Sequence, residues 1–138
     1  MQLSINQLVA LASPAILVLL PVAAAACTKS DNPNQCSLGL WGYVNGANVG
    51  TGVDISWKQA KIYDNQCGEI GFKDGINENQ SITSQLPLTV EVRRLDFNGN
   101  YNYIGFCYGG YCFEGDFACE LTSNNEKNWC YKTFDCPR

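Results

Sequence analysis

The sequence predicts an all-β fold, a small disulfide-stabilised antiparallel β-sandwich or Greek-key-like domain. Three observations support this class. Short apolar segments alternate with polar residues, asparagine and glycine turn signals separate these segments, and all eight cysteines lie from Cys27 onward. No helical periodicity is visible after the N-terminal segment. Residues 27–138 are long enough for one domain with a modest core, and we expect a single domain there.

Residues 1–26 have the properties of a secretory signal peptide. No charged side chain occurs in residues 1–28, residues 8–20 are mainly aliphatic, and four alanines follow at Ala23–Ala26. Signal peptidase requires small residues of this kind at its cleavage site, so we expect cleavage after Ala24, Ala25 or Ala26.

Two other interpretations of this segment remain open. A retained membrane anchor would have the required length, but Pro14, Pro21 and the missing basic flank disfavour it. A lipid anchor on Cys27 would leave an odd number of cysteines, which cannot all pair within one chain. We therefore expect a secreted protein without a stable membrane anchor after cleavage.

The cysteines predict an oxidising compartment, because their density is typical of small extracellular domains. Metal binding is disfavoured, since the chain has no Cys-x-x-Cys spacing and no histidine. No glycine-rich phosphate loop links a strand to a helix, so we expect no cofactor. All eight cysteines are expected in disulfides: Cys27, Cys36, Cys67, Cys107, Cys112, Cys119, Cys130 and Cys136.

The charge balance and the missing histidine exclude several functions. The net charge is −4, and Arg93-Arg94 is the only adjacent basic pair, so nucleic acid is not an expected partner. Without histidine, neither a Ser-His-Asp nor a Cys-His arrangement can form. We expect a protein that is not an enzyme.

The first half of the domain shows strand and turn signals in order. A strand is predicted near residues 38–44, followed by the turn dipeptide Asn45-Gly46. Residues 53–58 alternate between apolar and polar, as a half-buried strand does, and a further strand is expected to begin at residues 61–63. Residues 64–84 are rich in Asn, Gly, Asp and Gln, so they predict a long exposed connection.

That predicted connection carries a possible modification site. Asn79-Gln80-Ser81 is a glycosylation sequon, and sequons in polar loops of secreted eukaryotic proteins are often used. Cys67 is expected to pin the same connection to the body of the domain.

The second half predicts a C-terminal three-stranded meander. Residues 88–97 and 100–108 flank the turn dipeptide Asn98-Gly99, and Gly109-Gly110 then leads into a strand over residues 111–118. A last edge strand is expected between Cys130 and Cys136.

Two-residue loops would fix the register of this meander and sort its side chains onto two faces. Cys107 would lie opposite Cys112 at a non-hydrogen-bonded position, which predicts a disulfide between them; the other pairings stay open. The face predicted to form the core carries Leu95, Phe97, Ile104, Phe106, Tyr108, Tyr111, Phe113 and Phe117. The other face carries Arg94, Asp96, Tyr101, Tyr103, Glu114 and Asp116 at one end, and Val90, Val92, Cys107 and Cys112 at the other.

The polar end of the second face is the candidate binding surface. Its carboxylates Asp96, Glu114 and Asp116 could serve glycoside hydrolysis, although an ordinary solvated sheet surface has the same composition. Exposed tyrosine and tryptophan rings could stack on sugars, but aromatic residues in β domains are mostly buried, so we expect Trp41, Trp57 and Trp129 in the core.

The whole pattern resembles small cysteine-rich secreted effector proteins of plant-associated fungi: a signal peptide, a short domain with eight cysteines, no enzyme motif and an Asn/Gly/Tyr-rich composition. Fungal killer toxins share this outline. Ile62-Tyr63-Asp64 followed by Cys67-Gly68 is similar to the turn of a βγ-crystallin Greek key, a fold found among such toxins. The resemblance implies delivery into host tissue, such as the plant apoplast.

We therefore expect a secreted effector or elicitor that acts as a monomer by protein binding, through the polar face of the meander. Its partner would be an extracellular protein of a host or competitor, or a cell-wall glycan. The alternatives are a secreted toxin or antimicrobial protein, and a carbohydrate-binding module or small glycosidase.

Overall fold

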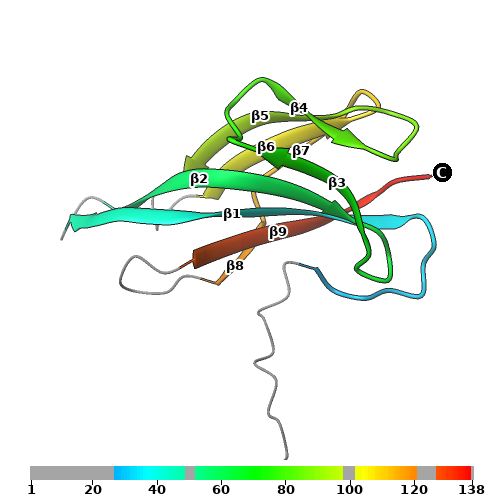
Figure 1. Ribbon diagram of the computed structural model, residues 1–138, viewed down its shortest axis with the longest axis horizontal. Helices are drawn as coiled ribbons and strands as arrows, with labels where there is room; N and C mark the ends of the chain where they lie inside the picture. Colours follow the sequence, from blue (N-terminus) through cyan, green and yellow to red (C-terminus); the bar gives the residue numbers. More distant parts are fainter. Residues whose placement is uncertain (1–26, 49–51, 98–101, 121–126, 138) are drawn as a thin grey trace, which may run out of the picture.

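A computed structural model describes residues 27–48, 52–97, 102–120 and 127–137. The predicted signal peptide, residues 1–26, lies outside the described residues. Within the described residues, the chain forms one nine-stranded antiparallel sheet that curls into a half-barrel (Figure 1). This part of the chain contains no helix of sufficient length and apolarity to cross a membrane.

The sheet is a meander that is extended at one edge. Strands β1 to β7 follow one another in space as they do in sequence, whereas β9 pairs with the free side of β1, and β8 pairs with β9. The strands are β1 (Gln35–Asn48), β2 (Gly52–Tyr63), β3 (Glu69–Asp74), β4 (Gln80–Ser84), β5 (Val90–Phe97), β6 (Asn102–Tyr108), β7 (Tyr111–Glu114), β8 (Ala118–Glu120) and β9 (Lys127–Asp135).

The predicted sandwich is therefore wrong, while the all-β class is confirmed. A sandwich needs two facing sheets, but here one sheet bends far enough to cover its own inner face. A Greek key would return the fourth strand beside the first, whereas β4 pairs with β3 and β5. Alternation along a strand shows which side is buried, but it does not show whether the facing layer belongs to the same sheet.

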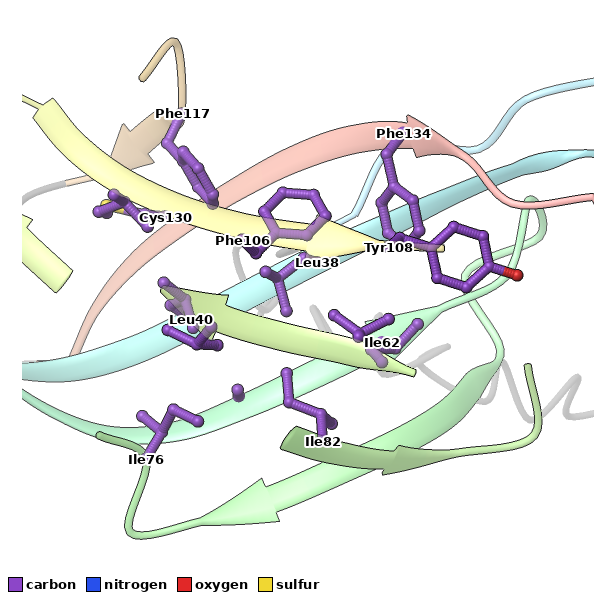
Figure 2. Close-up of a cluster of buried hydrophobic side chains, with 14 of the residues drawn as sticks. Leu38, Leu40, Ile62, Ile76, Ile82, Phe106, Tyr108, Phe117, Cys130 and Phe134 are labelled. Carbon is purple, nitrogen blue, oxygen red and sulfur yellow. The ribbon is translucent and has the colours of Figure 1, made fainter. Parts of the chain in front are cut away.

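Aromatic contacts across the core show how far the sheet curls. Phe134 of β9 and Phe106 of β6 lie at opposite ends of the strand order, yet their ring centroids are 5.1 Å apart. Phe134 also contacts Tyr108, at 5.5 Å. Figure 2 shows these rings enclosed with aliphatic side chains from the other strands. The labelled members are Leu38, Leu40, Ile62, Ile76, Ile82, Phe106, Tyr108, Phe117, Cys130 and Phe134.

The edges of the half-barrel are two very short strands, β7 and β8. They are joined by residues 115–117 only, and both Gly115 and Asp116 have positive φ, which ends β7 after Glu114. The predicted strand over residues 111–118 is thus two strands at opposite edges of the sheet. Short edge strands offer few unpaired backbone groups to other chains.

The polar segment 64–84 was expected to be a connection, but it contains β3 and β4. It pairs through its backbone and contributes few apolar side chains to the core, Ile82 among them. Similarly, Asn45-Gly46 is not a turn, because β1 continues to Asn48 and these two residues fall at an irregularity in the β1–β2 pairing. Residue types alone therefore predicted a loop where β3 and β4 lie, and a turn where β1 continues.

Four disulfides involve all eight cysteines: Cys27–Cys67, Cys36–Cys136, Cys107–Cys112 and Cys119–Cys130. Cys107–Cys112 is the pair that the register of the meander predicts. Cys36–Cys136 joins residues 100 positions apart and ties the start of β1 to the residue after β9. Four disulfides indicate an oxidising environment, as found outside cells.

Candidate binding surface

Four of the six predicted surface residues lie together on the outer side of β5, β6 and β7. Asp96 pairs with Tyr103 across β5 and β6, while Arg94 and Glu114 flank Gly105 of β6 from its two sides. We call Arg94, Asp96, Tyr103 and Glu114 the Arg94 cluster. All four side chains are exposed.

Arg94 organises this cluster. Its Nε donates a hydrogen bond of 2.8 Å to Oδ2 of Asp96, and its guanidinium lies 4.8 Å from the centre of the Tyr103 ring. The hydrogen bond to Asp96 is the main reason that the pKa of Arg94 is raised above its ordinary value, and the charge of Glu114 acts in the same direction. Arg94 thus contacts both the ring of Tyr103 and the carboxylate of Asp96, and the charge of Glu114 also acts on it.

Of the other two predicted surface residues, one lies in a turn and the other lies outside the described residues. Asp116 lies in the β7–β8 turn, where its Oδ2 is 3.9 Å from Nζ of Lys132. Tyr101 lies outside the described residues. Of the three carboxylates considered for glycoside hydrolysis, Asp96 and Glu114 are on strands, whereas Asp116 is in the turn after β7. No group of three metal-binding side chains occurs within the described residues.

The residues of the Arg94 cluster were predicted correctly, although the predicted pairing of β5 with β6 was not. A two-residue loop at Asn98-Gly99 would pair Arg94 with Tyr103, but the observed partner of Tyr103 is Asp96. The shift is two residues, and because side chains alternate with a period of two, it leaves Arg94, Asp96 and Tyr103 on their predicted face. Residues 98–101 themselves lie outside the described residues.

A β-bulge overturns the prediction for the other end of this face. The pairing shifts between Val92 and Arg94, so Arg93 is an extra residue. Beyond the bulge the alternation is reversed. Val90 and Val92, predicted on the outer face, are completely buried opposite Tyr108 and Phe106.

One predicted core residue is also misplaced. Tyr111 was assigned to the core face, but its side chain is 78% exposed, because it lies on the edge strand β7 next to the Gly109-Gly110 turn. Its neighbour Phe113 does pack inward and stacks on Phe106 at 4.9 Å.

The glycosylation sequon lies at an accessible turn. Asn79 is exposed just before β4, with a positive φ of 58°, and its backbone N–H donates to the carbonyl of Val92 at 2.7 Å. Modification of Asn79 stays a prediction.

The outer side of β9, β1, β2 and β3 carries two of the three tryptophans that were expected in the core. Trp57 is buried as predicted, with its Nε1 donating to the carbonyl of Leu95 at 3.0 Å. Trp41 and Trp129 are only partly buried, because their strand neighbours Leu40 and Cys130 take the inner positions. The outer aromatic face consists of Trp41, Tyr43, Phe72, Trp129 and Tyr131.

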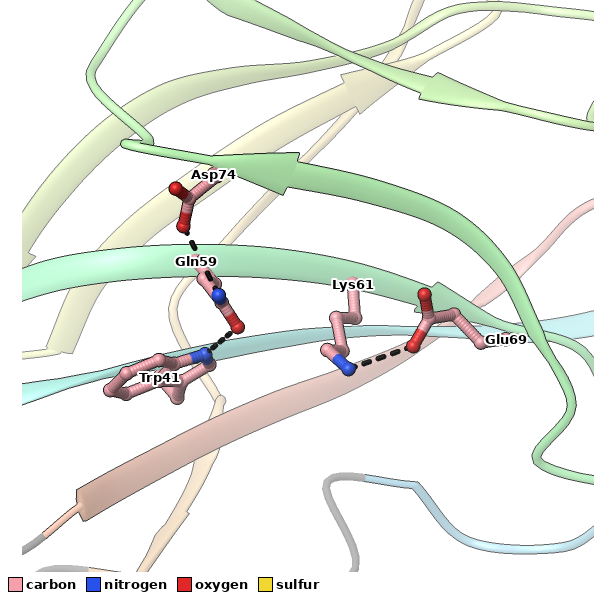
Figure 3. A network of polar contacts seen from close by, with 5 residues as sticks. All are labelled: Trp41, Gln59, Lys61, Glu69 and Asp74. Carbon is pink, nitrogen blue, oxygen red and sulfur yellow. Dashed lines mark hydrogen bonds and ion pairs between the residues drawn. The ribbon is translucent and has the colours of Figure 1, made fainter.

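Polar groups fix side chains within this face (Figure 3). Nε1 of Trp41 donates to Oε1 of Gln59, and Nε2 of Gln59 donates to Oδ1 of Asp74 at 3.1 Å. In the next row, Nζ of Lys61 lies 2.8 Å from Oε2 of Glu69 and 5.7 Å from the centre of the Phe72 ring. The hydrogen bond to Glu69 raises the pKa of Lys61.

Sequence reasoning could have found this face. Leu38 and Leu40 alternate with Trp41 and Tyr43 along β1, so the buried leucines leave these two rings on the outer side. The general preference of tryptophan for the core does not hold for Trp41 and Trp129, because their strand neighbours fill the inner positions.

No family model matches the chain, and neither a curated protein nor a solved structure matches it.

Proposed function

We propose that this protein is a secreted effector or elicitor that acts outside the producing cell by binding another protein, and that the Arg94 cluster is its contact surface. The observation that carries the proposal is Tyr103, which is 47% exposed and is held against Arg94 on a rigid sheet. Tyrosine and arginine are enriched among the residues that dominate binding energy at interfaces.

The rigidity of the surface supports binding. An interface loses less conformational entropy on association when its side chains are already ordered in the free protein. Arg94 and Asp96 order each other, and Gly105 between Arg94 and Glu114 lets the neighbouring side chains approach closely. The Cys107–Cys112 disulfide crosslinks two of the three strands beneath the cluster.

The four disulfides support action outside the cell. Each such bond typically contributes about 2–4 kcal/mol to stability, so the domain would resist unfolding and proteolysis in extracellular fluid. The resemblance to effectors of plant-associated fungi adds the setting of the proposal: host tissue, with an extracellular host or competitor protein as the partner. The proposed action is binding rather than catalysis.

The test is a dose–response assay of host tissue treated with the purified, oxidised protein. The variant Tyr103→Ala removes the central ring, and Tyr111→Ala is the matched control, because it removes an exposed tyrosine from the other end of the same meander. A hot-spot residue contributes at least about 2 kcal/mol, so Tyr103→Ala should require roughly a 30-fold higher dose. Circular dichroism and the melting temperature check that both variants fold.

Two outcomes would contradict the proposal. Equal potency of Tyr103→Ala, Arg94→Ala and the unsubstituted protein would remove the Arg94 cluster as the contact surface. Growth inhibition of competing microbes, with no response in host tissue, would favour a toxin instead.

A further inference from the structure

We propose a second binding site on the outer aromatic face, which takes a basic segment of a partner protein. The site is a row of five side chains that crosses five neighbouring strands, with a carboxylate at each end, two tryptophan rings and an amide. We call it the tryptophan row. Its members are Glu120 of β8, Trp129 of β9, Trp41 of β1, Gln59 of β2 and Asp74 of β3.

The strand register aligns this row. Glu120 pairs with Trp129, Trp129 with Trp41, Trp41 with Gln59, and Gln59 with Asp74. Paired residues in a sheet point to the same side. That side is the outer one, because the adjacent row contains Cys130, Leu40 and Ala60, which are completely buried.

The two indole rings offer a surface suited to cations. The ring centres of Trp41 and Trp129 are 6.1 Å apart at an interplanar angle of 41°, and both side chains are partly exposed. The face of an indole ring carries partial negative charge and attracts ammonium and guanidinium groups.

The carboxylates at the two ends give the row its charge. The ion pairs within the described residues involve the carboxylates of Glu69, Glu91, Asp96 and Asp116, but not those of Asp74 or Glu120. Asp74 accepts a hydrogen bond from the uncharged amide of Gln59. The row therefore carries two negative charges without a cationic partner among these residues.

The protein already places cations over rings in two other positions. Lys61 lies over the ring of Phe72 beside the row, and Arg94 lies over the ring of Tyr103 in the Arg94 cluster. In both cases a carboxylate holds the cation, Glu69 in the first and Asp96 in the second. Trp129 and the two end carboxylates supply the ring and carboxylate parts of this arrangement, and the partner would supply a cation.

Charge complementarity identifies the occupant as a basic peptide segment. A neutral sugar chain would use the rings but would leave both carboxylates without a counter-charge. The net charge of −4 adds long-range attraction for a basic partner. Strands lie about 4.8 Å apart, so the row spans roughly 19 Å, which an extended segment of about six residues can cover.

The test uses the oxidised protein and hexa-arginine as the probe, with uncharged hexa-citrulline as the matched peptide. We expect hexa-arginine to shift the indole N–H resonances of Trp41 and Trp129 in NMR spectra, and hexa-citrulline to leave them unchanged. The double variant Asp74→Asn, Glu120→Gln should weaken hexa-arginine binding about two- to fivefold for each carboxylate lost.

Two single variants complete the design. Trp129→Leu should weaken binding by roughly two- to fivefold through loss of the ring face. Asp31→Asn removes one exposed negative charge from the segment before β1, so it should bind hexa-arginine as the unsubstituted protein does. The double variant stays informative if Trp129→Leu fails to fold.

Three results would overturn the inference: no loss of binding in the double variant, equal loss in Asp31→Asn, or tighter binding of an N-acetylglucosamine oligomer than of hexa-arginine. The first two would indicate unspecific attraction, and the third a glycan site. The inference shares with the proposed function only the assumption that the partner is a protein. The two proposals can fail independently, because Tyr103→Ala changes the Arg94 cluster and the double variant changes the tryptophan row.

Discussion

At the scale of single residues, Gly42 shows how closely β1 and β2 approach each other. A Cβ atom at this position would lie 2.4 Å from the carbonyl oxygen of Ser56 and 2.9 Å from the Cα atom of Trp57. Both contacts are with backbone, which cannot move aside without disturbing the pairing of the two longest strands. We predict that Gly42→Ala lowers the free energy of unfolding by about 3 kcal/mol, the upper part of the usual range for overpacking, as measured by urea denaturation.

Gly105 of β6 is the matched control for this prediction. The nearest atom to a Cβ there is Cγ of Glu114, at 3.2 Å, which belongs to a flexible exposed side chain. Gly105→Ala should therefore cost about 1 kcal/mol or less. Equal losses for the two variants would mean that the close approach at Gly42 is not a constraint on the fold.

The residue scale also shows which parts of the surface the sequence could predict. Arg94, Asp96, Tyr103 and Glu114 were placed together from alternation alone, and they do lie together. Asp116 was predicted on a strand, but it lies in a turn and has positive φ. Alternation of apolar and polar residues predicts the face of a side chain only where the backbone stays extended.

At the scale of the strand, the bulge at Arg93 decides which side chains of β5 are buried. One extra residue lets Val90 and Val92 point inward on one side of the bulge, and Leu95 pack on the core on the other. Deletion of Arg93 would force one of these sets to change face. We predict a loss of about 3–6 kcal/mol in the free energy of unfolding, from roughly 1.5–3 kcal/mol for each buried aliphatic side chain, measured by urea denaturation.

Arg93→Ala keeps the residue count and separates the bulge from the side chain. The guanidinium forms an exposed ion pair with Glu91 at 3.1 Å, and such pairs contribute about 0–1 kcal/mol. This variant should therefore remain close to the unsubstituted protein in stability. If both changes cost the same, the side chain rather than the bulge would be the stabilising feature.

The bulge also explains the main error in the predicted meander. The hairpin signals correctly indicated β5, β6 and β7, and the Gly109-Gly110 turn fixed the pairing of Cys107 with Cys112. No residue type in β5 marks the bulge, because Arg93 and Arg94 are both exposed and both suit a strand. Val90 and Val92 were therefore assigned to the wrong face by counting through an unrecognised insertion.

At the scale of the whole molecule, the sequence predicted the all-β class but not the half-barrel. The class follows from local signals that each strand carries. Closure depends on which strands meet across the core, such as β9 and β6 through Phe134 and Phe106, and on the pairing of β9 with β1. The residues involved are 28 positions or more apart in the chain, so no local pattern reports their contact.

The same distinction between local and distant contacts predicts how much each disulfide contributes to the stability of the fold. A disulfide stabilises mainly by restricting the unfolded chain, and the effect grows with the number of residues that it encloses. Cys36–Cys136 spans 100 positions, whereas Cys107–Cys112 spans 5. In the chain-entropy treatment, these correspond to about 4.7 and roughly 2 kcal/mol.

Replacement of each pair by alanine tests this difference. We expect Cys36→Ala with Cys136→Ala to lose about 2–3 kcal/mol more in the free energy of unfolding than Cys107→Ala with Cys112→Ala, by urea denaturation under oxidising conditions. Burial acts in the same direction, because Cys36 and Cys136 are almost completely buried whereas Cys112 is exposed. If the short-range pair proved the more stabilising one, the half-barrel would depend on local crosslinking of β6 and β7, and not on the covalent joining of the two ends of the domain.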